Sequence, residues 1–258
     1  MMEARALNKA FHAGTPNERI ALSNVSLHLA LGDFAVVIGG NGAGKSTLLN
    51  VIAGEVQVDS GNVVIDGMDV THVPTYRRAA KIARVFQDPL VGTAGSMTIE
   101  ENLALAERRG GRNGLRLGLS GTARKRYRDR LASLGLGLEN RMNQKVELLS
   151  GGQRQSLALL MAVIKPPKLL LLDEHTAALD PKTADIVMRA TIEAVERDRL
   201  TALLVTHNMQ HALAHGNRVV MMSEGRVVFE ANADEKARLT VEGLMRRFHV
   251  TSDRMLLS

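Results

Sequence analysis

A glycine-rich loop between a predicted strand and a predicted helix is the strongest constraint on the fold. Phe34–Ile38 is a continuous apolar run, which is typical of a strand buried on both faces of a sheet. Residues 39–47 follow it, read Gly-Gly-Asn-Gly-Ala-Gly-Lys-Ser-Thr, and contain the pattern G-x-x-x-x-G-K-[ST]. Lys45–Ala53 then has a helical pattern that ends at Gly54. This order of strand, loop and helix predicts a site for phosphate groups.

Apolar runs and helical segments alternate along much of the remaining chain. Runs typical of buried strands recur at Ile82–Phe86, Leu169–Leu172, Leu203–Thr206 and Val219–Met222, and Pro181–Arg197 has a helical pattern. Such alternation is typical of a mostly parallel sheet with helices on both faces. We therefore predict an α/β fold with a P-loop NTPase core.

Two sections depart from this alternation. The segments Arg5–Phe11, Ala21–Leu29 and Val63–Asp66 predict a small antiparallel β subdomain. The segments Thr98–Arg109, Thr122–Leu134 and Gln153–Ile164 predict a section that is entirely helical. We expect residues 1–88 and 165–258 to form the core, with the antiparallel β subdomain and a C-terminal tail. Residues 89–164 are expected to form an inserted helical subdomain.

Composition narrows the classes of site that the chain can carry. The 258 residues include no cysteine, which excludes disulfides and thiolate metal sites. The formal net charge of +6 suits an anionic ligand, an anionic membrane surface or nucleic acid, and does not choose among them. The longest apolar runs, Leu169–Leu172 and Leu157–Ile164, are well short of the roughly 20 residues that span a bilayer.

The residue types in the glycine-rich loop explain how it would hold phosphates. Glycines let backbone N–H groups converge on phosphate oxygens, and the helix dipole adds positive potential at the same point. Lys45 can reach the β- and γ-phosphates of a nucleotide, Ser46 is the expected Mg²⁺ ligand, and Thr47 is expected at the α-phosphate. The predicted nucleotide contacts in the loop are Gly39, Gly40, Asn41, Gly42, Ala43, Gly44, Lys45, Ser46 and Thr47. The alternative is a glycine-rich turn with an incidental lysine.

Two carboxylates follow the apolar run Leu169–Leu172. Ligands bind at the carboxyl ends of strands in α/β sheets, so Asp173 is expected to hold Mg²⁺, through water. Glu174 is expected to orient or deprotonate an attacking water. The alternative is a pair of acids that cap a helix after a core strand.

Leu149-Ser150-Gly151-Gly152-Gln153 has the pattern of a helix start. Ser150 is expected to cap the helix Gln153–Ile164, and Gly151 and Gly152 expose N–H groups that suit an anion.

With these motifs in this order, the chain resembles ABC-type ATPases from Phe11 to about Phe248. In that family the anion at Ser150, Gly151, Gly152 and Gln153 is the γ-phosphate of an ATP molecule held by the other protomer. The resemblance implies ATP and Mg²⁺ as cofactors, and Ser46, Gln87 and Asp173 as the residues at the metal.

The resemblance also assigns residues that carry no signal by themselves. Gln87 matches the Q-loop glutamine, which senses Mg²⁺ and the water, and His207 matches the switch histidine at the γ-phosphate. With Glu174 they form the expected catalytic set. Asp180 matches the D-loop, which crosses the dimer interface. Phe11 is the candidate for stacking on adenine, and a core aromatic is the alternative.

One residue departs from the family pattern. Most members have proline after the glutamate, whereas this chain has His175, which removes a restriction on φ and adds an ionisable group. The run from Asp173 to Pro181, with Phe86–Glu101 and Thr206–Ala212, resembles a subgroup of bacterial importers. That subgroup pairs with a branched-chain-type permease and a binding protein often assigned to tryptophan or tyrosine.

The resemblance implies a subunit that hydrolyses ATP to power a membrane importer of amino-acid-like or other small solutes. Its expected partners are a second copy, head to tail, transmembrane permease subunits and, indirectly, a solute-binding protein. No nucleic acid is expected, and the expected location is peripheral, at the cytoplasmic face of the inner membrane. The alternative is a cytosolic ABC ATPase without a permease, such as an iron–sulfur assembly ATPase.

A basic segment extends over residues 108–130, with nine arginines and lysines against one acid, Asp129. It is interpreted as a solvated face, and the alternative is a surface for a permease or for anionic lipid headgroups.

Overall fold

The computed structural model describes residues 1–111 and 120–247, which divide into two compact units. Residues 1–78 and 201–247 belong to the first unit, and residues 79–111 and 120–200 belong to the second.

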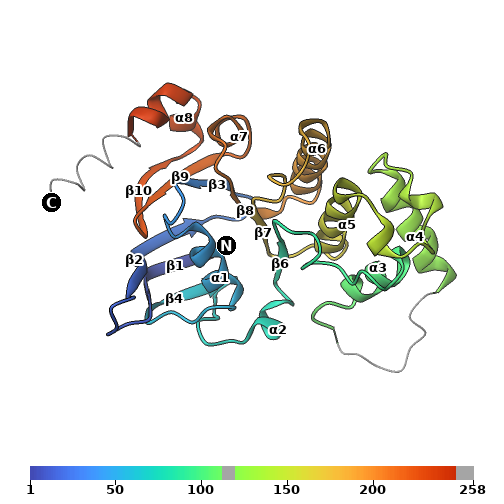
Figure 1. Ribbon diagram of the computed structural model, residues 1–258, viewed down its shortest axis with the longest axis horizontal. Coiled ribbons are helices and arrows are strands. Elements are labelled where there is room, and N and C mark those ends of the chain that lie inside the picture. The colour runs from blue at the N-terminus through green and yellow to red at the C-terminus, as the bar shows by residue number, and fades with distance from the viewer. Residues whose placement is uncertain (112–119, 248–258) are drawn as a thin grey trace. The chain divides into compact units, whose positions relative to one another are not determined.

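The first unit contains the predicted antiparallel sheet. Its strands are β1 (Met2–Phe11), β2 (Arg19–Leu29), β4 (Ser60–Ile65) and β5 (Met68–Asp69), in the order β2-β1-β4-β5 (Figure 1). Alternate side chains of these strands, such as Val25 and Leu27, are fully buried and form the core on one face.

The first unit also contains four strands in the order β10-β9-β3-β8. The strands β3 (Phe34–Gly39), β8 (Thr201–Val205) and β9 (Arg218–Ser223) are parallel, and β10 (Arg226–Ala231) pairs antiparallel with β9. Every residue of β3 and β8 is buried, as continuous apolar runs predict. The helices of this unit are α1 (Lys45–Ala53), α2 (Thr75–Arg78), α7 (Met209–Ala214) and α8 (Ala233–Lys236), and residues 241–247 are also helical.

In its described residues, the second unit combines a parallel strand pair with four α-helices. The strands β6 (Ile82–Val85) and β7 (Leu169–Asp173) pair in the register Val85↔Leu172. The helices are α3 (Ile99–Glu107), α4 (Gly121–Ala132), α5 (Gly151–Val163) and α6 (Pro181–Arg197), with short 3-10 turns at Leu138–Asn140 and Val146–Leu148.

The helices α3, α4 and α5 pack against one another (Figure 1), and buried side chains from all three form a hydrophobic core. Leu103 of α3, Tyr127 of α4 and Leu157 of α5 are fully buried in it. This core lies within the section expected to be an inserted helical subdomain, residues 89–164. The predicted boundaries of that subdomain stay a prediction.

Side-chain caps decide where several helices begin. Thr98 and Ser150 each form a capping box with the residue three positions later, so α3 begins at Ile99 and α5 at Gly151. The sequence predicts that the helix capped by Ser150 begins at Gln153, whereas α5 begins two residues earlier, at Gly151. The helix α4 ends at Ala132, before the predicted Leu134.

Arg78 binds backbone carbonyl oxygens at the carboxyl end of α1. Its buried guanidinium donates hydrogen bonds of 2.8 Å to the carbonyl oxygens of Val51 and Ile52, and it also bonds Thr71 and Val73. Gly54 caps the helix in the left-handed region with φ of 84°. A Cβ atom there would lie 2.6 Å from the Arg78 Nε atom, so glycine makes room for the guanidinium.

Gly44 packs the amino end of α1 against the antiparallel sheet. It has φ of 97°, and a Cβ atom on it would overlap the carbonyl oxygen of Ala21 in β2. The overlapping atom belongs to the backbone of β2, which cannot move aside as the end of a flexible side chain could. The close approach of α1 to β2 therefore requires glycine at this position.

We predict that Gly44→Ala lowers the free energy of unfolding by about 2 kcal/mol or more, because backbone overlap adds to the strain of a positive φ. Gly32→Ala is the matched control, since Gly32 has φ of 80° with nothing within 4 Å of an added Cβ. It should cost only about 1 kcal/mol. Urea unfolding of both variants measures the difference, and equal losses would contradict the close-packing explanation.

Candidate functional site

The glycine-rich loop folds back over its own lysine. Lys45 is 7% exposed, and its ammonium donates hydrogen bonds to the carbonyl oxygens of Gly39 (2.8 Å) and Gly40 (3.0 Å). Gly42 and Gly44 have φ of 82° and 97°, a region that L side chains rarely adopt. The loop therefore holds a buried positive charge at the amino end of α1.

The first turn of α1 suits an anion. Its N-cap residue, Gly44, supplies no side-chain hydrogen bond, and the turn contains no acidic residue. Ser46 is exposed and Thr47 is half-buried in this turn. The backbone donors, the helix dipole and the lack of side chains at the four glycines of the loop fit phosphate oxygens.

His207 lies at the same edge of the parallel strands as this loop. The strands β3 and β8 pair in the register Val37↔Val205, so their carboxyl ends are adjacent. The loop follows β3, and the exposed His207 comes two residues after β8. The fold thus brings these two predicted elements of the site together in the first unit.

Phe11 is connected to the loop through its strand partner. It is half-buried at the end of β1 and pairs with Arg19 of β2. A Cβ atom on Gly42 would lie 3.2 Å from the Arg19 Nη2 atom, so the Arg19 side chain reaches the loop. The Lys9 ammonium lies 5.6 Å from the Phe11 ring centroid. The stacking role of Phe11 stays a prediction.

The predicted carboxylates, Asp173 and Glu174, lie in the second unit, at the carboxyl end of β7. Asp173 is the last residue of β7, and its Oδ2 atom accepts a hydrogen bond of 2.6 Å from the Arg84 Nη2 atom. The Arg84 guanidinium also lies 4.6 Å from the Phe86 ring centroid. The sequence analysis did not select Arg84, although a charged residue inside the apolar strand β6 was the available signal.

Gln87 comes two residues after β6, so it lies at the same strand edge as Asp173 and Glu174. It is exposed. The preceding residue, Phe86, accepts a hydrogen bond of 3.0 Å at its carbonyl oxygen from the Nε2 atom of Gln155, which is fully buried in α5. Gln155, another residue that the sequence analysis missed, therefore ties this strand end to α5.

Ser150 caps α5 as predicted, and the two glycines after it differ. Gly151 is exposed, and a Cβ atom there would meet only Leu179 Cδ2 at an ordinary 3.7 Å. Gly152 is buried, and a Cβ atom there would overlap the Thr183 side chain of α6. Gly152 is thus needed for close packing of α5 on α6, in addition to any role toward an anion.

Asp180 is the N-cap of α6. Its carboxylate accepts a hydrogen bond of 3.1 Å from the Thr183 backbone amide. Hydrogen bonds from the Thr183 side chain and backbone lower the pKa of Asp180, so the carboxylate is charged at neutral pH.

Three basic residues in the described part of the basic segment form contacts within the second unit. Arg109 donates to the carbonyl oxygens of Ala162 and Lys165. Arg124 pairs with Glu100, and Arg126 pairs with Glu107. Burial and a hydrogen bond to Glu107 raise the pKa of Tyr127 to about 12. Arg112 and Arg116 lie outside the described residues.

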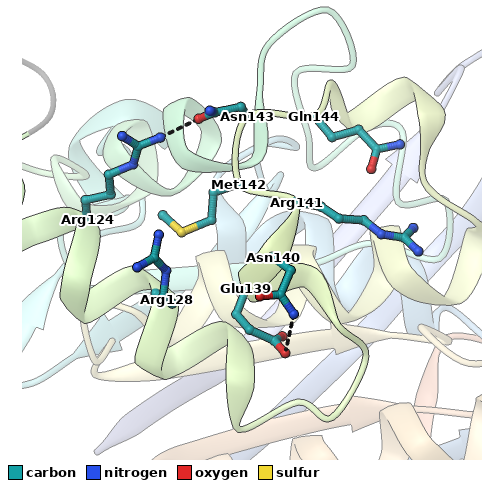
Figure 2. Close-up of a pocket in the computed structure, with 8 residues that line it drawn as sticks. All are labelled: Arg124, Arg128, Glu139, Asn140, Arg141, Met142, Asn143 and Gln144. Carbon is teal, nitrogen blue, oxygen red and sulfur yellow. Dashed lines mark hydrogen bonds between the residues drawn. The ribbon is translucent and has the colours of Figure 1, made fainter.

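A surface depression of about 570 Å³ lies beside this segment. Figure 2 shows that Arg141 points away from Arg124 and Arg128, so the three guanidinium groups do not converge on one point. The lining residues include none of the predicted nucleotide contacts.

Two searches of residues 1–111 and 120–247 bear on metals and membranes. In these ranges the structure contains no cluster of three histidine, aspartate or glutamate side chains that could hold a metal ion. No helix in the described ranges has the length and apolar character needed to cross a membrane.

Comparison with known proteins agrees with this geometry. Residues 22–177 match the family model described as ABC transporter. The chain is 42% identical to a tyrosine transport ATP-binding protein of Clostridioides difficile (strain R20291), over 96% of this chain and 98% of that protein. It is 34% identical to the putrescine transport ATP-binding protein PotG of Escherichia coli (strain K12), over 88% of this chain and 56% of that longer protein.

Solved structures show the same fold. The dimeric post-hydrolysis structure of the ATP-binding cassette MJ0796, bound to ADP and Pi, is 32% identical, with a TM-score of 0.77 over 90% of this chain and 99% of that one. The ADP conformation of the cassette MJ1267 is 25% identical, with a TM-score of 0.78 over 97% and 98%. Given the glycine-rich loop, the carboxylates at the end of β7 and these likenesses, the chain belongs to the ABC transporter family, as one of its ATP-hydrolysing, ATP-binding subunits.

Proposed function

We propose that this chain powers a bacterial importer of an amino acid or a chemically similar small solute. The observation that carries the proposal is the 42% identity to a tyrosine transport ATP-binding protein over nearly the full length of both chains. The transported solute is bound by other subunits. This similarity therefore supports the class of transporter more directly than it supports the identity of the solute.

The proposed partners are a transmembrane permease and, indirectly, a solute-binding protein. The proposed location is the cytoplasmic face of the membrane, where a peripheral subunit reaches both the permease and ATP.

We propose that the loop at residues 39–47 binds the phosphates of ATP. The buried ammonium of Lys45 and the first turn of α1 supply positive potential. Glu174 is the proposed base for the attacking water, and Gln87 and His207 are proposed to orient the water and the γ-phosphate. Phe11 is the proposed stacking partner of adenine.

Mg²⁺ fits the residues proposed for it, because this ion usually takes one or two protein oxygens and completes its shell with water and phosphate. The Ser46 hydroxyl is exposed at the start of α1. Asp173 ends β7, and Gln87 comes two residues after the neighbouring strand β6. When bound, the ion supplies charge neutralisation at the phosphate oxygens. Asp173 is already held by Arg84, which keeps its carboxylate in a defined position.

We propose that two copies share each ATP, head to tail. Lys45 and Ser150 belong to different units of one chain. The related cassette MJ0796 has a dimeric structure, which supports this arrangement. In such a dimer, the Ser150, Gly151, Gly152 and Gln153 segment of one chain faces the loop of the other, and Asp180 lies at the interface.

The transporter assignment is tested by co-expression with a candidate permease of the branched-chain type. The chain should copurify with the permease. Proteoliposomes that also receive the binding protein should take up radiolabelled tyrosine or tryptophan only with ATP, and Lys45→Ala should abolish uptake. An active ATPase that copurifies with no membrane protein would contradict the assignment.

The role of Glu174 is tested by Glu174→Gln, which keeps the shape of the side chain and removes its basicity. We expect turnover to fall about 100-fold or more while ATP binding is retained, so the ATP-bound dimer accumulates on size exclusion. Glu196→Gln, at an exposed position of α6, is the control and should leave turnover unchanged. Wild-type turnover in Glu174→Gln would refute the role of Glu174.

Shared sites are tested by mixing two inactive variants, Lys45→Ala and Ser150→Arg. Each mixed dimer keeps one intact site, so random mixing should restore roughly a quarter of wild-type activity. Gly151→Arg is a second partner variant, because Gly151 is exposed and the Ser150 cap stays in place. No rescue with either partner, together with turnover strictly linear in protein concentration, would exclude a shared site.

A further inference from the structure

The backbone of Glu174 has an unusual conformation. Its φ is 41°, in the left-handed region where a side chain other than glycine is strained by about 1–3 kcal/mol. Such a conformation persists only where the surrounding structure holds it. On its amino side, β7 is fixed by pairing with β6. On its carboxyl side, the Glu174 carbonyl oxygen accepts a hydrogen bond of 2.9 Å from the Ala177 amide.

The next residue, His175, is anchored in the interior. It is 1% exposed, and its Nε2 atom lies 2.9 Å from the Oγ1 atom of Thr191, a fully buried residue of α6. The Thr191 hydroxyl donates to the Val187 carbonyl oxygen at 2.8 Å. That bond uses the only hydroxyl proton, so the Thr191 oxygen accepts from His175. The His175 Nε2 atom therefore carries a proton.

We propose that His175 is a positioning residue for ATP hydrolysis. Its hydrogen bond to Thr191 holds the turn behind Glu174 against α6, and so sets the direction in which the Glu174 carboxylate points. The inference rests on the proposed role of Glu174 as the base. In this chain a buried side-chain hydrogen bond supplies the restraint.

His175 acts through Glu174, because its own ring is enclosed. With 1% exposure and its Nε2 proton directed at Thr191, the imidazole does not reach solvent or a bound nucleotide. Thr191 is therefore the residue through which the restraint is tested with the least disturbance to the turn.

The central variant is Thr191→Val, which keeps the shape of the side chain and removes the acceptor. We expect kcat for ATP hydrolysis to fall about tenfold or more, because a small displacement of a reacting group is costly, while KM for ATP changes less than twofold. Thr191→Ser retains the hydroxyl and should restore kcat to within about twofold of wild type. His175→Leu should match Thr191→Val, and the double variant should be no slower than the slower single variant.

A matched control separates positioning from loss of stability. Thr201 is also a buried threonine, and its hydroxyl bonds the Gly32 amide and the Ala30 carbonyl oxygen in the first unit. Thr201→Val should lower thermal stability without lowering kcat selectively. If Thr191→Val changes kcat no more than Thr201→Val at equal loss of stability, the role of His175 is only structural and the inference fails.

A spectroscopic readout tests the bond without activity. Nitrogen-15 labelling of histidine in the intact chain should give a His175 signal with a slowly exchanging proton on Nε2, and this signal should shift in Thr191→Val. A proton on Nδ1 alone would overturn the inference. If Thr191→Val is fully active while Glu174→Gln is inactive, the inference fails and the proposed function stands. Full activity of Glu174→Gln would instead refute the proposed role of Glu174 as the base, on which the inference rests.

Discussion

The close packing of the glycine-rich loop against the antiparallel sheet is the constraint on which the first unit depends. Gly44 approaches the Ala21 carbonyl oxygen too closely for any side chain, and this contact sets where α1 begins. The start of α1 in turn determines where the Lys45 ammonium lies. The ammonium donates hydrogen bonds to the carbonyl oxygens of Gly39 and Gly40. Positive potential is therefore built into the backbone at the carboxyl end of β3.

The second unit places two acids at a strand end and restrains each by a different means. Asp173 is held by a charge-assisted hydrogen bond from Arg84, which fixes the position of its carboxylate. Glu174 has a strained backbone, and the buried pair of His175 and Thr191 follows it.

The helices α1 and α6, which have clear capping residues in the sequence, were predicted with the correct bounds. Gly44 and Gly54 stand at the two ends of α1, and Asp180 and Pro181 mark the start of α6. The edge strand β10 and the short helix α7 were not predicted, since six residues of mixed polarity carry little periodicity. The start of α5 was placed late because its two glycines favour a loop when judged locally.

The sequence by itself determined the glycine-rich loop between β3 and α1, the acids that follow a buried strand and the cap at Ser150, because each depends on residues within a few positions of one another. Only the tertiary structure decided the partners of these groups. Arg84 and Asp173 are 89 positions apart, and His175 and Thr191 are 16 apart. Thr183, which requires glycine at position 152, lies on another helix. Such pairs meet only when strands align and helices pack, and no local pattern of residues encodes that distance.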